Sequence, residues 1–225
     1  MDIILKYFKN LSALQVQQLY TLHLLYMNLH SNNERFNARK DINTFYIKEV
    51  LYAYSIGRYI DFKAGTRVLD VGSGPGFPCI PLAVLFPQIQ FTMCDYANNI
   101  QIAKEVSDFL ELKNTVIYQG KVQELQEKYH FVSARAVAYP EEIYLWTKHM
   151  LSEDNFNDKP NGYLLFKDDY LKKEIRQLQN LDSEIIVEEI ELSRLYDENF
   201  FDRQKMIYFY KKSLNNLAIM QDKVA

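Results

Sequence analysis

The sequence is poor in cysteine, glycine and tryptophan, with two, seven and one of these among 225 residues. Cys79 and Cys94 are too few for a disulfide framework or a four-cysteine metal site. We therefore expect two reduced thiols packed near strand ends, a reducing compartment and no bound metal. No apolar run approaches the roughly 18 residues of a membrane span. The opening "MDIILKYF" is too short and wrongly charged for a secretory signal, so we expect a cytoplasmic protein with no membrane contact.

An excess of positive charge is also lacking. The chain has 26 basic and 29 acidic residues, a formal net charge of −3, and 48% hydrophobic residues. This balance excludes a protein that coats nucleic acid by bulk electrostatics, but a local basic face stays open. Composition and length are typical of one globular domain with a small appendage. We expect a helical extension over residues 1–62, a core over 63–212 and a tail over 213–225.

The apolar pattern changes at about residue 66. Before it, leucines at helical spacing predict a helix over 12–29 with Ser12 as its N-cap, and a second helix over 42–60 that starts near Asn43 or Thr44. After it, β-rich runs alternate with helical ones. Strands are expected at 66–72, 89–95, 114–120, 129–137 and 162–168, with helices at 77–86, 98–112 and 141–151. This alternation predicts an α/β fold around a parallel sheet. The last two β-rich runs, 183–192 and 205–212, have no helix between them and predict an antiparallel pair at the sheet edge.

Three of the seven glycines crowd into "VLDVGSGPGFPCIPLA", residues 68–83. Glycines after a strand let a ligand approach the backbone closely, beside the free N–H groups of a helix start. The spacing is G-x-G-x-G and not the G-x-G-x-x-G of a pyrophosphate site. Pro75 and Pro78 remove two donors that a phosphate would use, and no Lys-Ser/Thr pair follows. The turn therefore argues against a phosphate ligand.

Asp95 ends the second expected strand, 23 residues after Gly72. An acid at the carboxyl end of that strand is placed to accept hydrogen bonds from a ribose diol. Both NAD and S-adenosylmethionine carry such a ribose. The structural alternative is that Asp95 caps the helix beginning near Asn98. The glycine spacing and the terminal antiparallel pair favour S-adenosylmethionine and a class I, Rossmann-like methyltransferase core with a mostly parallel seven-stranded sheet whose last strand is antiparallel.

The turn also carries a rarer extension. "DVGSGPGFPCIPLA" is similar to the "DVGtGxGFPGiPLA" of the bacterial RsmG or GidB family, which methylates guanine N7 in small-subunit ribosomal RNA. "FKAGTRVLDVG", "LELKN", "FVSARAVA", "NGYLLFKDD" and "FFDRQKMIYFY" extend the resemblance in the same order over nearly the whole chain. The resemblance implies a monomeric enzyme that binds S-adenosylmethionine and acts on 16S ribosomal RNA in the small subunit.

The resemblance also implies site residues. The cofactor-binding candidates are Gly72, Ser73, Gly74, Gly76, Phe77, Asp95, Val122, Gln123 and Arg135. The guanidinium of Arg135 could hold the carboxylate of the cofactor or an RNA phosphate. The plainer alternatives are core packing for Phe77 and a surface ion pair for Arg135.

RNA binding requires phosphate contacts and a stacking surface. The candidates for RNA are Arg35, Arg39, Lys40 and Lys167, with Tyr96 or Tyr139 stacking on a flipped guanine. Arg39 and Lys40 could equally be a charged run that leads into a helix, and most of the 17 tyrosines are packing residues. Guanine N7 has a lone pair and no proton, so no base is needed and we assign no catalytic residue.

The sequence departs from the family at several positions. Glu49 to Ala53 lack the family histidine, Tyr96 to Ile100 lack a serine and two lysines, Cys79 replaces a glycine, and Asp168 replaces the glycine after Lys167. These losses lie mainly on the expected RNA side. Two other functions therefore stay open: a degenerate paralogue that binds cofactor or RNA without turnover, and a small-molecule methyltransferase.

Overall fold

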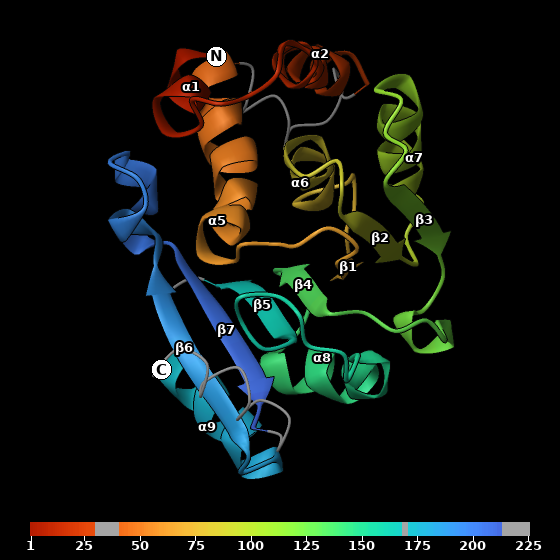
Figure 1. The fold of residues 1–225 in the computed structure, drawn as a ribbon, viewed down its shortest axis with the longest axis vertical. Coiled ribbons are helices and arrows are strands. Elements are labelled where there is room, and N and C mark those ends of the chain that lie inside the picture. The colour runs from red at the N-terminus through yellow and green to blue at the C-terminus, as the bar shows by residue number, and fades with distance from the viewer. Residues whose placement is uncertain (30–40, 168–170, 213–225) are drawn as a thin grey trace.

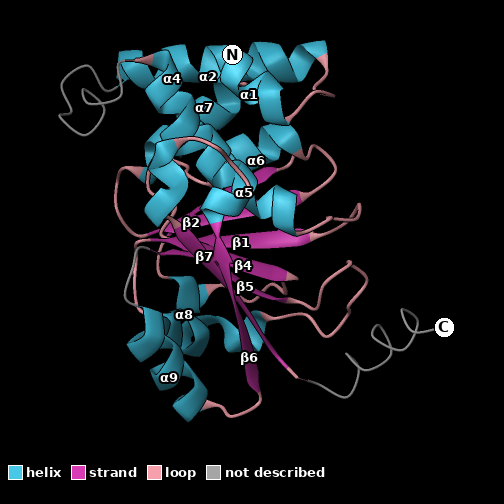
Figure 2. Ribbon diagram, turned by 90° about the vertical axis from the view of Figure 1, so that its left-hand side faces the viewer, coloured by secondary structure: helices cyan, strands magenta, loops and turns pink. Residues whose placement is uncertain are grey.

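The chain folds into three layers, with a sheet between two sets of helices (Figures 1 and 2). The structure, a computed structural model, describes residues 1–29, 41–167 and 171–212. The strands are β1 (Arg67–Val71), β2 (Gln90–Asp95), β3 (Thr115–Gln119), β4 (Phe131–Arg135), β5 (Gly162–Lys167), β6 (Ile185–Glu191) and β7 (Lys205–Lys211). They form one seven-stranded sheet in the order β3-β2-β1-β4-β5-β7-β6. β7 pairs antiparallel with both β5 and β6, and the other pairs are parallel, as expected.

The helices lie on both faces of the sheet. One face carries α1 (Asp2–Tyr7), α2 (Ala13–Leu29), α4 (Ile42–Phe45), η1 (Tyr46–Leu51), α5 (Tyr52–Tyr59), α6 (Cys79–Leu85) and α7 (Ile100–Phe109); the other carries α8 (Pro140–Thr147) and α9 (Leu171–Leu181) (Figure 2). Short 3-10 helices are η2 (Val122–Glu124), η3 (Lys148–Met150), η4 (Leu192–Arg194) and η5 (Asn199–Arg203). We call the two sides of the sheet the α6 face and the α8 face.

Strand alternation sorts side chains between the two faces. In β5, Leu164 and Phe166 join the apolar cluster under α5 and α6, while Tyr163 and Leu165 join the cluster under α8 and α9. Successive side chains of a strand point to opposite faces, and parallel neighbours in register share a face. Arg135 is in register with Phe166, so it lies on the α6 face. Lys167, the next residue of β5, lies on the α8 face.

The N-terminal helices confirm the helical prediction and correct one detail. Ser12 caps α2, because its Oγ accepts from the Gln15 N–H at 3.2 Å. The second expected helix begins at Ile42, close to Asn43 and Thr44 as expected, and its cap is Asp41, whose carboxylate accepts from the Thr44 N–H at 2.7 Å. The expected single helix over 42–60 is interrupted by the π-helical segment η1.

The other differences are local. α9 follows β5 and was not predicted, and α8 ends at Thr147, before a 3-10 turn. Apolar side chains of α2, α5, α6 and the sheet form one continuous cluster across the expected boundary at residue 62. Within the described part of the chain, no helix is both long and apolar enough to cross a membrane.

Candidate functional site

The glycine turn joins β1 to α6 at the carboxyl edge of the parallel strands. Gly72, Gly74 and Gly76 adopt φ angles of +69°, +52° and +109°, which side chains with a Cβ rarely adopt. A Cβ on Gly72 would lie 2.3 Å from Cγ2 of Val137, and one on Gly76 would lie 2.6 Å from Cγ1 of Ile80. The same position on Gly74 meets only Asn99, at 3.5 Å. Gly72 and Gly76 therefore serve close packing, and Gly74 presents an open backbone.

The N–H groups of this turn all have partners inside the protein. The N–H groups of Gly72 and Ser73 donate to the Cys94 carbonyl at 2.7 and 3.3 Å, and those of Gly76 and Phe77 donate to the Ser73 carbonyl at 2.8 and 3.2 Å. Gly74 donates to Asp95 Oδ2 at 2.9 Å. Pro75 and Pro78 have no N–H to offer. Because no donor is free, the turn is unsuited to a phosphate, in agreement with the argument from glycine spacing.

Asp95 ends β2 and lies beside the glycine turn. Its Oδ2 accepts from Gly74 and its Oδ1 accepts from the Ala97 N–H at 2.9 Å. Helix α7 begins at Ile100, with Asn99 as its N-cap, so Asp95 does not cap it. The carboxylate instead ties the two loops together at the carboxyl ends of β1 and β2. Its remaining lone pairs can accept hydroxyl groups of a ligand.

Asp70 lies beneath the turn, on the α6 face, and is 1% exposed. Its Oδ1 accepts from the Ser133 hydroxyl at 2.7 Å, and its Oδ2 is buried without a hydrogen-bond partner in the described residues. Burial raises the pKa of Asp70 from 3.8 to about 7, against the opposing effects of the Ser133 hydrogen bond and the Arg135 charge. Sequence reasoning assigned Asp70 no role.

Phe77 is buried at the start of α6 and packs against Tyr26 of α2, with ring centroids 4.7 Å apart. The Tyr26 hydroxyl donates to the carbonyl of Pro75 at 2.5 Å. The N-terminal helices therefore brace the glycine turn directly. Cys79 is buried behind it, and burial raises its pKa well above the ordinary value, so the thiol stays protonated and inert.

Arg135 ends β4 and pairs with Glu49 of η1. Its Nη2 lies 2.8 Å from Glu49 Oε2, with the Arg135 side chain 21% exposed and the Glu49 side chain fully buried. The guanidinium also lies over the rings of Tyr52 and Phe77, at 5.8 and 5.6 Å from their centroids. The ion pair expected as the plain alternative is thus present, but it is largely buried. It joins the N-terminal helices to the carboxyl edge of the parallel strands.

Lys167 does not lie with Arg135, because the two side chains occupy opposite faces of the sheet. Its Nζ lies 2.8 Å from Glu174 Oε2 of α9 and donates to the Ala138 carbonyl at 3.2 Å. Tyr139, 56% exposed, has its ring centroid 5.9 Å from the same Nζ. Tyr96 is 80% exposed in the loop after β2, near Asp95 in sequence.

The remaining predicted residues divide into two groups. Val122 is buried and Gln123 exposed in η2, which follows β3, and Gly120 of the same loop donates its N–H to the Asp95 carbonyl at 3.0 Å. This places Val122 and Gln123 on the loop next to Asp95. Arg35, Arg39 and Lys40 lie outside the described residues.

Sequence reasoning missed three residues of the site: Glu49, Ser133 and Tyr26. Glu49 stands where the resemblance expects a histidine, and a charged residue within an apolar helix could have indicated a buried partner. Ser133 and Tyr26 have no such signal. Their roles depend on strand register and on helix docking, which a single sequence does not display.

Comparison with known proteins places the chain in a family. The sequence profile of the GidB family, described as rRNA small subunit methyltransferase G, matches residues 18–199. Ribosomal RNA small subunit methyltransferase G of Cytophaga hutchinsonii is 39% identical over 92% of this chain and 98% of its own. The protein of the same name from Bacteroides thetaiotaomicron is 34% identical, again over 92% of this chain and 98% of its own.

Solved structures share the fold. A glycopeptide N-methyltransferase complexed with sinefungin gives a TM-score of 0.58 at 9% identity, covering 73% of this chain and 87% of its own. The ribosomal protein L11 methylase of Lactobacillus delbrueckii subsp. bulgaricus gives a TM-score of 0.54 at 13% identity, covering 73% of this chain and 79% of its own. The fold is thus that of class I methyltransferases, as the sequence predicted. With its profile match and its full-length relatives, the chain belongs to the GidB family of rRNA small subunit methyltransferases.

Proposed function

We propose that this chain transfers a methyl group from S-adenosylmethionine to N7 of a guanosine in 16S ribosomal RNA. The observation that carries the proposal is family membership together with the glycine turn, which offers close backbone approach, no free phosphate donor and a carboxylate beside it. When bound, S-adenosylmethionine supplies an electrophilic methyl group on a positively charged sulfur. We propose the cytoplasm as its location and a monomer as the active form.

The residues of the site fit this cofactor in outline. Asp95 has lone pairs left for the ribose hydroxyls, and Val122 and Gln123 lie on the neighbouring loop, where they would border the adenine. Gly72, Ser73, Gly74, Gly76 and Phe77 would form the floor under the amino-acid portion. The buried Asp70 adds negative charge beneath the turn when it is ionised, which favours a cationic ligand.

The reaction requires alignment of guanine N7 with the methyl carbon and does not require proton transfer. When bound, S-adenosylmethionine would supply the methyl carbon, which the lone pair of guanine N7 would attack as the C–S bond breaks and leaves its electron pair on sulfur. No proton moves, so no side chain has to act as a base. The protein contributes by holding the base in line with the methyl carbon, and positioning of this kind can supply most of a rate enhancement. Arg135, braced by Glu49, is the residue we propose at the mouth between cofactor and RNA.

The test is methyl transfer to small ribosomal subunits purified from cells that lack this gene. Calorimetric titration first measures the affinity for S-adenosylmethionine. Radiolabelled transfer and mass mapping of the RNA then identify the modified base. We expect one N7-methylguanosine per subunit, and Asp95→Asn should weaken cofactor binding. Absence of cofactor binding would overturn the proposal.

One observation favours the alternative of a binder without turnover. Glu49, in place of the family histidine, engages the Arg135 guanidinium and leaves less of it for RNA. That alternative predicts tight binding of the cofactor and the subunit with no methyl transfer to any ribosomal RNA. Measurable turnover by the wild-type chain removes it.

A further inference from the structure

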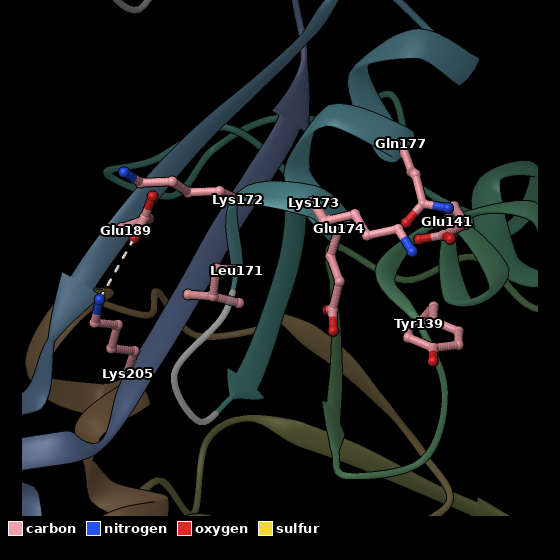
Figure 3. Close-up of a pocket in the computed structure, with 9 residues that line it drawn as sticks. All are labelled: Tyr139, Glu141, Leu171, Lys172, Lys173, Glu174, Gln177, Glu189 and Lys205. Carbon is pink, nitrogen blue, oxygen red and sulfur yellow. Dashed lines mark ion pairs between the residues drawn. The ribbon is translucent and has the colours of Figure 1, made fainter.

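A hollow of about 760 Å³ opens on the α8 face beyond β5, apart from the glycine turn. Figure 3 shows its lining, which comes from the start of α8 and the residue before it, the first turns of α9, and the strands β6 and β7. The lining residues are Tyr139, Glu141, Leu171, Lys172, Lys173, Glu174, Gln177, Glu189 and Lys205. An aromatic ring, cations and carboxylates thus surround a space large enough for a nucleotide.

The cations of the hollow are of two kinds. Lys205 is 3.8 Å from Glu189, and Lys167, which is not itself a lining residue, is 2.8 Å from the lining residue Glu174, so both are engaged by carboxylates. Lys172 and Lys173, at the exposed start of α9, form no ion pair among the described residues. Exposed lysines at a helix start, without carboxylate partners, are suited to contact phosphates of a nucleic-acid backbone.

The remaining lining groups suit a base. The exposed ring of Tyr139 lies at the rim, with the Lys167 ammonium 5.9 Å from its centroid. Such a ring stacks on any nucleobase. Glu141 also lines the hollow. Its Oε2 is buried and accepts no hydrogen bond within the described part of the chain, so this side chain would have to turn before that oxygen could accept from a base.

The position of the hollow relative to the glycine turn determines which nucleotide of the RNA it can bind. The hollow borders β5, β7 and β6, whereas the glycine turn follows β1, two strands before β5 in the sheet. Neighbouring strands lie about 4.8 Å apart, so the hollow is roughly 10–20 Å from the turn. It is also on the opposite face from Arg135. The methylated base has to reach the turn, so a base in the hollow is a different one.

We propose that this hollow binds a nucleotide that flanks the methylated guanosine in the same RNA strand, with Tyr139 stacking on its base and Lys172 and Lys173 contacting its phosphates. This proposal rests on the proposed function, since it assumes that the chain acts on RNA. It assigns to Tyr139 a flanking base in place of the target guanine that the sequence suggested.

The test measures methyl transfer to small subunits from cells lacking the gene, with Tyr139→Ala, Tyr139→Phe and a Lys172→Gln/Lys173→Gln double variant. The matched control is Lys113→Gln/Lys128→Gln, which removes two exposed charges near the amino ends of β3 and β4. Loss of stacking should raise the KM for subunits about tenfold in Tyr139→Ala, with kcat and cofactor affinity unchanged, while Tyr139→Phe retains the wild-type KM. The double variant should reduce the salt slope of binding by roughly 1 to 2, and the control should not.

Filter binding of the same subunits, with S-adenosylhomocysteine present, separates this proposal from the function on which it rests. If the wild-type chain transfers no methyl group yet loses affinity in Tyr139→Ala, the proposed function fails and the subsite stands. If transfer occurs and neither KM nor subunit affinity changes in Tyr139→Ala and in the lysine variant, the subsite is wrong. Unchanged cofactor affinity in each variant shows that it is folded.

Discussion

Replacement of Asp70 by asparagine should change how the stability of the protein depends on pH. Burial raises the pKa of Asp70 to about 7 in the folded chain, from 3.8. Between these two values the folded state holds a proton on Asp70 that the unfolded state has released. The free energy of unfolding therefore falls as pH rises through this window, because the folded state binds more protons. The loss is complete above about pH 7.

The magnitude follows from the size of the pKa change. At about 1.36 kcal/mol for each pH unit, Asp70 removes about 4 kcal/mol of stability between pH 4 and pH 8. Asparagine keeps an oxygen to accept the Ser133 hydroxyl bond, at 2.7 Å in the native protein, and carries no charge. Its amide N–H groups add a desolvation cost of about 1–3 kcal/mol, but this cost does not vary with pH.

Urea unfolding of the wild type and Asp70→Asn at several pH values from 5 to 8.5 measures the difference. Over this range the variant should gain about 2.7 kcal/mol on the wild type, two pH units at about 1.36 kcal/mol each, with most of the gain below about pH 7.5. Asp202→Asn, at an exposed position in η5, controls for the loss of one carboxylate and should follow the wild type. Parallel stability curves for the wild type and Asp70→Asn would refute the argument.

Three further predictions concern the turn and its supports. Arg135→Met removes the guanidinium that lies 2.8 Å from the buried Glu49 carboxylate and should cost about 3 kcal/mol in urea unfolding, more than Glu49→Gln; a double-mutant cycle with no coupling between the two would contradict this. Gly72→Ala should destabilise the fold by more than Gly74→Ala, because the new Cβ at position 74 contacts only Asn99 and costs about 1–2 kcal/mol from the positive φ alone. Val137→Ala should recover part of the stability lost in Gly72→Ala. Equal losses of stability in Gly72→Ala and Gly74→Ala would show that the Val137 contact is unimportant. Asp95→Asn should weaken S-adenosylmethionine and S-adenosylhomocysteine equally, by about tenfold or more in calorimetry, because both carry the ribose; a loss for only one of them would exclude the ribose as its partner.

The sheet could be predicted because its signals are local. β1 to β5 are apolar runs, most of them separated by helical segments, which predicts parallel pairing; the order of the strands in the sheet was not predicted. The antiparallel pairing of β6 and β7 follows from the missing helix between them. α9 was missed although its sequence carries the signal: Leu171, Ile175, Leu178 and Leu181 follow the spacing of an amphipathic helix, with Leu171 and Leu178 buried.

The site was predicted where the chain itself brings residues together and missed where distant segments meet. Gly72 to Phe77 are contiguous, and Asp95 is one βαβ unit away, so spacing alone places them at one edge. The Arg135–Glu49 pair joins residues 86 apart and depends on the π-helical segment η1. The separation of Arg135 from Lys167 depends on side-chain alternation in β4 and β5, whereas the sequence argument had offered both residues as RNA contacts.

The most direct test of the account is mass mapping of 16S ribosomal RNA from cells with and without this gene, combined with transfer in vitro by the purified chain. The account predicts one guanosine that carries an N7-methyl group only when the gene is present, and that the purified chain restores with S-adenosylmethionine. Identical methylation of the RNA in both cell lines, with no transfer in vitro, would contradict it.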